Sequence, residues 1–145
     1  MSRIPRYQEH LKTGFTAEAV SAARCRAYAA RAESDGRPNL ARQWLRLAAE
    51  KDGLAVKLLV AADQVRGEDA DLGTALSEER YENDVLYPKM VRDVDQATGD
   101  VILQVLEAQK THLRQMEELR EALNSSSGDV ALPAEVDEGT LAKRR

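Results

Sequence analysis

Apolar residues recur at steps of three and four along four long stretches of this chain, and polar breaks separate the stretches. Such spacing places side chains on one face of an α-helix. The first stretch shows it most clearly, with a stripe that reads Leu11, Phe15, Glu18, Ala22, Cys25, Ala29, Ala32. The pattern predicts four amphipathic helices, which bury their apolar faces by packing on one another.

Composition narrows the class of protein. The chain has 145 residues, enough for one domain with a core, and aromatic residues make up only 4%. The net charge of −4 comes from mixed charges without a basic stripe, so nucleic-acid binding is not expected. No apolar run approaches the ~20 residues of a membrane span, and the start of the sequence lacks the apolar region of a secretory signal. A single cysteine excludes an internal disulfide. We therefore expect a cytoplasmic protein that does not enter a membrane.

Turn signals set the expected boundaries of the first two helices. The first helix should run from residue 6 to about residue 33, because residues 35–38 read Asp-Gly-Arg-Pro, a stop signal. Asn39 is a candidate cap for the second helix. We expect that helix to end before the polar residues 67–71.

The second half of the chain has weaker signals. Asp71 is a candidate cap for the third helix, and Pro88 should bend this helix rather than end it. Residues 98–100 read Thr-Gly-Asp and should separate the third and fourth helices. Together these boundaries predict an all-α, antiparallel four-helix bundle over residues 1–124. Residues 125–145, rich in Ser and acidic residues, should form a flexible tail.

Polar residues interrupt the apolar stripe of every predicted helix. They are Glu18, Asp52, Glu79, Glu82, Gln109 and His112. Asp52 lies seven residues from both Leu45 and Leu59, whereas Glu50 lies seven residues from Gln43 and Lys57, so we predict Asp52 as the inward residue. By the same test Glu78, Glu107, Glu117 and Glu118 belong to the surface.

Each of these residues also has an ordinary structural interpretation. One inward Gln or His can be a hydrogen-bonded core residue, and one Glu at a stripe edge can reach water. The joint occurrence on four helices favours a shared centre, because buried carboxylates need a compensating charge. A pair of metal ions would supply that charge.

Four segments of the chain carry a family resemblance. They are residues 11–18, which end in Glu18; residues 39–42 together with 47–52; Glu79-Arg80-Tyr81-Glu82 followed by Tyr87-Pro88; and residues 106–112, which end in His112. Across roughly residues 8–123 they resemble the rubrerythrin branch of the ferritin-like superfamily. In that family, carboxylates and Glu-x-x-His pairs hold two irons inside a four-helix bundle.

The chain departs from the family pattern at several positions. The second helix reads Asp52-Gly53-Leu54-Ala55 where the family has Glu-x-x-His, and the last helix has Gln109 three residues before His112. Cys25 stands where the family commonly has tyrosine, and it is either a soft metal ligand or a small buried residue. The four cysteines of a rubredoxin-like module are absent.

The resemblance implies a di-iron redox protein that reduces peroxide or dioxygen. Glu18, Asp52, Glu79, Glu82, Gln109 and His112 would hold two irons per chain, with manganese or zinc as alternatives. Glu82 would act as a mobile carboxylate and proton relay, and Tyr87 would donate a hydrogen bond near the site. Electrons would come from an external donor protein, and the family implies a homodimer.

Two other functions fit the same sequence. One is a ferritin-like protein that oxidises and stores iron, whose last eight residues, 138–145, faintly resemble tails that dock cargo inside encapsulin shells. The other is a bundle that has lost catalysis and serves as a binding protein, which the missing histidine and Gln109 would favour.

Overall fold

A computed structural model of the chain describes residues 6–132. Its helices are α1 (Arg6–Ser34), α2 (Pro38–Ala61), α3 (Glu68–Tyr81), the π-helix η1 (Glu82–Leu86), α4 (Tyr87–Asp93) and α5 (Gln96–Ser125). No β-strand occurs within residues 6–132, which confirms the expected all-α class. Since α3, η1 and α4 follow one another without a break, the chain has the four helical rods that the periodicity predicts.

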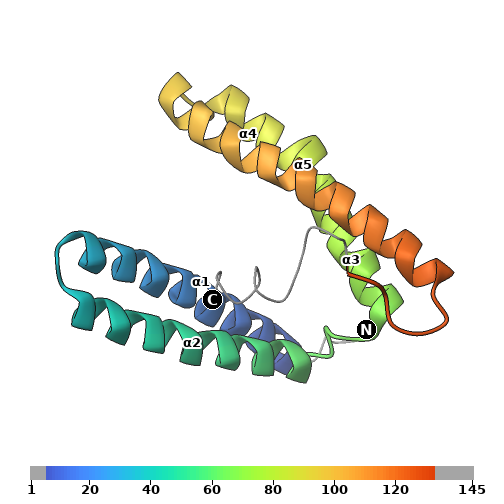
Figure 1. Cartoon of the computed structure of the whole chain (residues 1–145), viewed down its shortest axis with the longest axis horizontal. Helices are drawn as coiled ribbons and strands as arrows, with labels where there is room; N and C mark the ends of the chain where they lie inside the picture. The colour runs from blue at the N-terminus through green and yellow to red at the C-terminus, as the bar shows by residue number, and fades with distance from the viewer. Residues whose placement is uncertain (1–5, 133–145) are drawn as a thin grey trace. The chain divides into compact units, whose positions relative to one another are not determined.

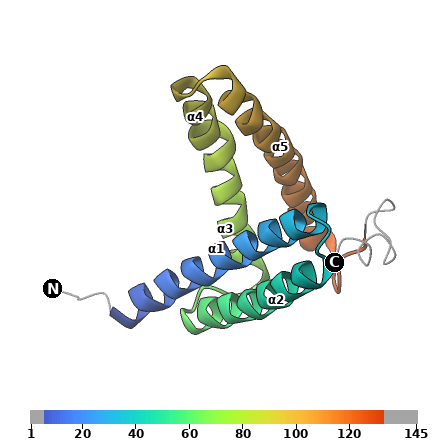
Figure 2. The ribbon, with the colours of Figure 1, turned by 90° about the vertical axis from the view of Figure 1, so that its left-hand side faces the viewer.

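The chain divides into two compact units, residues 1–67 and residues 68–145. We call α1 with α2 the first hairpin, and α3, η1, α4 and α5 the second hairpin. In both views of the ribbon α1 lies beside α2, and the rod from α3 to α4 lies beside α5 (Figures 1 and 2). None of the described helices combines the length and the apolar character that crossing a membrane requires.

The seam of the first hairpin consists mostly of alanine. Its buried members are Ala22, Cys25, Ala29 and Ala32 of α1, and Ala41, Ala48 and Ala55 of α2. All seven residues of the predicted α1 stripe are buried or half-buried, so that prediction is confirmed. On α2 the predicted stripe is only partly buried, because Leu45, seven residues before Asp52, is 50% exposed. Small seam residues allow the two helices to approach closely, and larger side chains remain beside the seam.

The turn between α1 and α2 follows the predicted stop signal. Gly36 has a φ of 75°, a left-handed conformation that favours glycine. Helix α2 begins at Pro38, and no side chain caps it, so the predicted Asn39 cap is wrong. Proline at the first helical position brings a suitable φ and has no N–H that needs a partner.

Two contacts give the register of the first hairpin. A Cβ added at Gly14 would lie 3.1 Å from Leu58 Cδ1, and the rings of Tyr28 and Trp44 pack edge to face with centroids 5.1 Å apart. These pairs place α1 residues opposite α2 residues in antiparallel order.

The second hairpin accommodates Pro88 through the π-helix that precedes it. The Tyr87 N–H donates to the Glu82 carbonyl, five residues back, and Pro88 follows in the first turn of α4. Proline removes one backbone donor and crowds the carbonyl four residues earlier. A wider turn just before Pro88 relieves that crowding, and the rod continues through the proline as predicted.

Two predicted boundaries in the second hairpin are wrong. Helix α3 begins at Glu68, so Asp71 lies inside its first turn instead of capping it. The break before the last helix falls at Val94 and Asp95, and residues 98–100 are helical. Asp95 is the actual cap, because its Oδ1 accepts a hydrogen bond from the Thr98 N–H at 2.8 Å.

Each hairpin exposes large apolar side chains. In the first hairpin these include Val20, Leu45, Leu54, Val56 and Val60, and in the second Val85, Val101, Leu103, Val105 and Leu119. Exposures range from 40% for Val105 to 60% for Val56 and Val101. Two-helix units bury only part of their apolar surface, so these residues remain available for further packing.

The last helix ends near the predicted position. Helix α5 stops at Ser125, and residues 126–132 form no helix. Residues 133–145, including the segment that resembles a cargo tail, lie outside the described residues. The flexible tail therefore stays a prediction.

Candidate metal centre

Four of the predicted ligands belong to the second hairpin. Glu79 lies in the last turn of α3 and Glu82 opens η1, while Gln109 and His112 lie on α5. The three-residue spacing in each pair puts both side chains on one face of the helix. The Nδ1 of His112 lies 3.4 Å from Gln109 Oε1, but His112 is exposed, so its predicted inward position is wrong.

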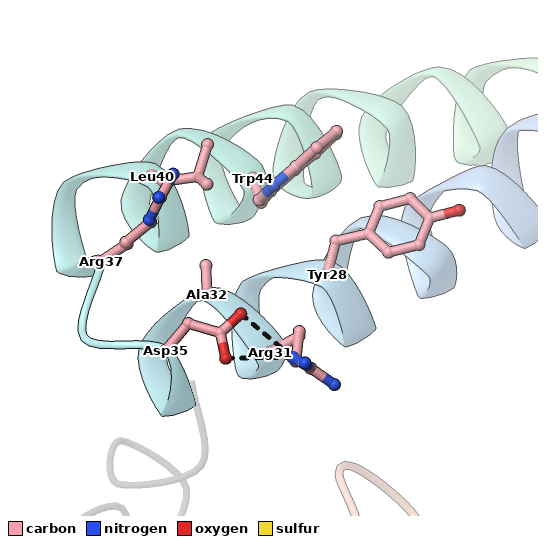
Figure 3. Close-up of a pocket in the computed structure, with 7 residues that line it drawn as sticks. All are labelled: Tyr28, Arg31, Ala32, Asp35, Arg37, Leu40 and Trp44. Atoms are coloured by element: carbon pink, nitrogen blue, oxygen red, sulfur yellow. Dashed lines mark hydrogen bonds and ion pairs between the residues drawn. The ribbon is translucent and has the colours of Figure 1, made fainter.

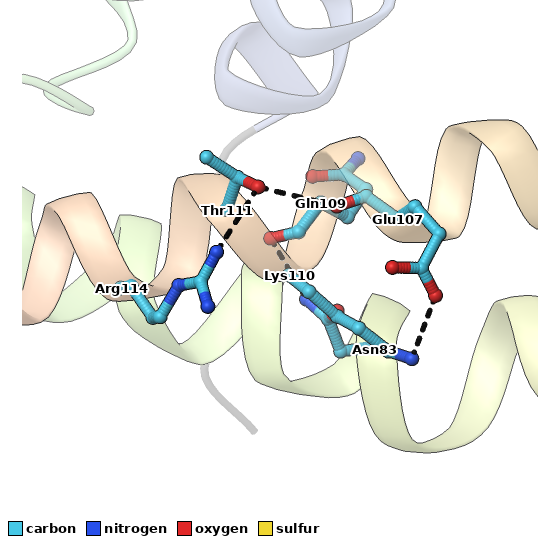
Figure 4. Close-up of polar contacts among 6 residues, drawn as sticks. All are labelled: Asn83, Glu107, Gln109, Lys110, Thr111 and Arg114. Carbon is cyan, nitrogen blue, oxygen red and sulfur yellow. Dashed lines mark hydrogen bonds and ion pairs between the residues drawn. The ribbon is translucent and has the colours of Figure 1, made fainter.

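Asn83 joins the two helices at this level. Its Nδ2 donates to the backbone carbonyl of Glu79 at 2.7 Å and to that of Gln109 at 3.4 Å. Figure 4 shows Asn83 facing α5 near Gln109. The structure therefore brings the turn that carries Glu79 next to the turn that carries Gln109.

Asn83 is not among the residues that the sequence predicts for the site. The residue is only 8% exposed and is the one buried polar side chain among the described residues. It lies seven residues after Leu76, which is buried at 1% exposure, so the spacing test that selected Asp52 would have found it.

Two buried acceptor atoms in this cluster have no partner. Neither Glu79 Oε2 nor Asn83 Oδ1 accepts a hydrogen bond within the described part of the chain. Buried oxygen atoms without donors are costly, and native proteins rarely leave them so unless a proton, water or cation completes them. The cluster thus contains two buried oxygens that need a donor or a cation to complete them.

The Glu82 carboxyl group also lies in an environment that disfavours its negative charge. Burial raises the pKa of its carboxyl above the ordinary value of 4.5, and the negative charges of Glu79 and Glu78 raise it further. A positive ion in this place would relieve the repulsion. Without one, Glu82 holds its proton more strongly than a solvated glutamate does.

The outer face of α5 carries exposed polar and charged side chains, as predicted. Lys110 Nζ lies 3.0 Å from Glu107 Oε1, and Arg114 donates to the Thr111 hydroxyl at 3.4 Å (Figure 4). The predicted surface residues Glu78, Glu107, Glu117 and Glu118 are all exposed.

The other two predicted ligands belong to the first hairpin, where each carboxylate pairs with a cation. Glu18 Oε2 lies 3.2 Å from Lys51 Nζ, and Asp52 Oδ2 lies 2.7 Å from Arg26 Nη1. The Asp52 side chain is 53% exposed, so its predicted inward position is wrong, and half-buried Lys51 lies closer to the seam. Seven-residue spacing does not indicate these partners, because it depends only on neighbours along one helix, and Lys51 and Arg26 reach across the seam between two helices.

The register places Glu18 and Asp52 at a similar height. Gly14 lies opposite Leu58, and Tyr28 lies opposite Trp44. In this register Asp52 lies opposite position 20 of α1, which is two residues from Glu18. Two residues correspond to about 3 Å along the helix axis. The first hairpin thus offers two carboxylates within one helical turn of each other.

Tyr87 and Cys25 have different surroundings. Tyr87 is the half-buried first residue of α4, directly after η1. Cys25 is a free thiol in the alanine seam with 4% exposure, which agrees with a small buried residue. Within residues 6–132, no three His, Cys, Asp or Glu side chains gather closely enough to hold a metal ion.

Comparison of the sequence with models of known families and with curated proteins gives no match. The function must therefore be inferred from the residues and their geometry.

Proposed function

We propose that the chain is a rubrerythrin-like di-metal protein, and that it reduces peroxide or dioxygen with electrons from an external donor protein. One observation supports this most directly: buried Glu79 Oε2 and Asn83 Oδ1 have no donor, and Glu82 beside them has a raised pKa. A cluster with surplus buried acceptors favours binding of positive ions.

The donor set suits hard divalent ions. The proposed ligands are Glu79, Glu82, Gln109 and His112 of the second hairpin, with Glu18 and Asp52 of the first hairpin. Four carboxylates balance the four charges of two divalent ions, and one imidazole with one amide oxygen suits iron, manganese or zinc. Iron, as the redox-active member, would supply one electron per ion when bound.

Ligation by the first hairpin requires its two ion pairs to open. The side chains of Asp52 and Arg26 are about half exposed, and those of Glu18 and Lys51 about a third. Solvent-exposed ion pairs stabilise a protein by only about 0–1 kcal/mol. This is far less than a metal–carboxylate bond set provides, so Lys51 and Arg26 would yield to a metal.

The apolar surface left exposed on each hairpin supports a larger assembly. We propose that the hairpins pack as a ferritin-like bundle and that a second chain completes a homodimer. Leu54, Val56 and Val101 are 51–60% exposed, so burying the rest of each side chain would contribute about 1–2 kcal/mol. The same packing would surround the carboxylates and exclude water from them.

Glu82 and Tyr87 would handle protons. The carboxyl of Glu82 has a raised pKa and lies at the start of a π-helix, a feature common at functional sites. As a mobile carboxylate, it would take up a proton when it leaves the metals and pass that proton to the reduced oxidant. Tyr87 would donate a hydrogen bond from the other end of the π-helix.

Metal content tests the proposal. The protein is refilled with ferrous iron without oxygen, washed, and measured by elemental analysis; we expect close to two irons per chain. Glu79→Met should lower the content, whereas Glu78→Met, an exposed neighbour on the same helix, should not. The ferrous form should then change its absorption spectrum rapidly when peroxide is added. A content close to zero would overturn the proposal.

A second candidate function rests on the ion pairs of Glu18 and Asp52. Because Lys51 and Arg26 already neutralise these carboxylates, a bundle without catalysis would be stable without metal. In that case the protein would act as a binding module, and chelators would leave its thermal midpoint unchanged.

A further inference from the structure

A pocket lies at the end of the first hairpin where α1 turns into α2. Its volume is about 400 Å³, within the range of small-molecule sites. Its walls come from the last turns of α1, the connecting residues and the first turns of α2 (Figure 3). None of its residues belongs to the candidate metal centre.

One wall of the pocket is aromatic. Tyr28 and Trp44 pack edge to face with an interplanar angle of 63°. The indole also packs against buried Ala29, Ala32 and Ala41, which hold it in place. Tyr28 is nevertheless 47% exposed and Trp44 only half-buried, so the pair presents ring surface to the pocket. Fixed aromatic surface of this kind suits a flat ring.

The end of the pocket nearer the turn carries surplus positive charge. Arg31 Nε donates to both oxygens of Asp35, at 3.1 and 3.0 Å, and Asp35 is the only acid among the described residues that line the pocket. The Arg37 guanidinium has no carboxylate within 4.0 Å in the described residues, although it lines the same space. Figure 3 shows Arg37 on the α2 side, away from the Arg31–Asp35 pair. Its five N–H donors therefore remain available to a ligand.

We propose that this pocket binds a planar aromatic ring that carries an anionic group. The ring would lie against Tyr28 and Trp44, and the anion would accept hydrogen bonds from Arg37. Carboxylate and phosphate both match the guanidinium fork. The paired Asp35 keeps Arg31 from competing and would repel a cationic ligand.

Flavin mononucleotide is a suitable probe, because it joins a flat ring to a phosphate and loses fluorescence when the ring stacks. We expect saturable quenching of flavin emission by the full chain. Riboflavin has the same ring without phosphate and should bind about tenfold more weakly, since a hydrogen bond to a charged group contributes on that scale. A planar aromatic carboxylate should compete with the probe, and inorganic phosphate alone should not.

Two sets of variants test the anion contact and the ring contact of the pocket one at a time. Arg37→Gln should weaken flavin mononucleotide about tenfold and leave riboflavin unchanged. Arg24→Gln removes the same charge from an exposed α1 residue outside the pocket and should change nothing. Trp44→Leu should weaken both ligands, and Trp44→Phe, which keeps a ring, should restore part of the binding. Far-ultraviolet circular dichroism checks that each variant folds.

Three results would overturn the inference. They are no saturable binding, equal affinity for both flavins, and equal effects of Arg37→Gln and Arg24→Gln. Metal content should be unchanged in Arg37→Gln, so this test and the test of the metal centre can fail independently.

Discussion

Glu79 should lower the stability of the metal-free protein, although the proposed function requires it. Its Oε2 is buried without a partner, and leaving such an acceptor unpaired costs about 1–3 kcal/mol. Methionine has a similar length, a comparable helix propensity and no buried oxygen. Glu79→Met should therefore raise the free energy of unfolding of the metal-free protein by about 1–3 kcal/mol.

Urea unfolding followed by circular dichroism measures this change. With a slope of about 1–3 kcal/mol per molar urea, the midpoint should rise by roughly 1 M. Glu78→Met is the matched control, because Glu78 is exposed one residue earlier on α3, and it should change stability by no more than about 0.5 kcal/mol. A metal-free Glu79→Met protein that is less stable than the unmodified chain would refute the reasoning. So would an equal gain in both variants.

Three other predictions follow from the same structure. Because the pKa of Glu82 is raised in the folded state, ionisation of its carboxyl group lowers the free energy of unfolding. This loss of stability is absent below the unfolded pKa near 4.5 and complete above the folded pKa. Glu82→Gln should thus be more stable than the unmodified metal-free chain at pH 7 and equally stable at pH 4, and equal stability at both pH values would contradict this. Gly53 lies inside α2 with nothing within 4 Å of an added Cβ, so Gly53→Ala should gain up to about 1 kcal/mol in thermal unfolding. Leu76, at 1% exposure, packs in the second hairpin, so Leu76→Ala should cost about 2–5 kcal/mol in urea unfolding; a cost below 1 kcal/mol would show that α3 does not pack as described.

The sequence predicted best where local rules decide the structure. The α1 stripe from Leu11 to Ala32 was confirmed throughout, because steps of three and four follow directly from helix geometry. The turn at Gly36 was also predicted, since a left-handed position after a helix favours glycine. The boundary before α5 was misplaced because the Thr98-Gly99-Asp100 motif resembles a break, while Asp95 caps the helix through Thr98.

The candidate site depended more on tertiary structure. Periodicity placed Glu79, Glu82, Gln109 and His112 on facing helices, and the Asn83 hydrogen bonds put the Glu79 and Gln109 turns at one level. No periodic pattern assigns Lys51 to Glu18 or Arg26 to Asp52, because these pairs join residues 33 and 26 positions apart.

The sequence by itself determined that the chain is helical, where α1 begins and ends, and which face of α1 is buried. Hydrogen bonding within four residues and the burial of apolar stripes are enough for that result. Tertiary structure alone decided that Pro88 follows a π-helix, that Asn83 is buried with an unpaired oxygen, and that Arg37 faces a pocket beside Trp44. Such features depend on which side chains from distant positions meet across a seam, and contacts of that kind leave no periodic mark in the sequence.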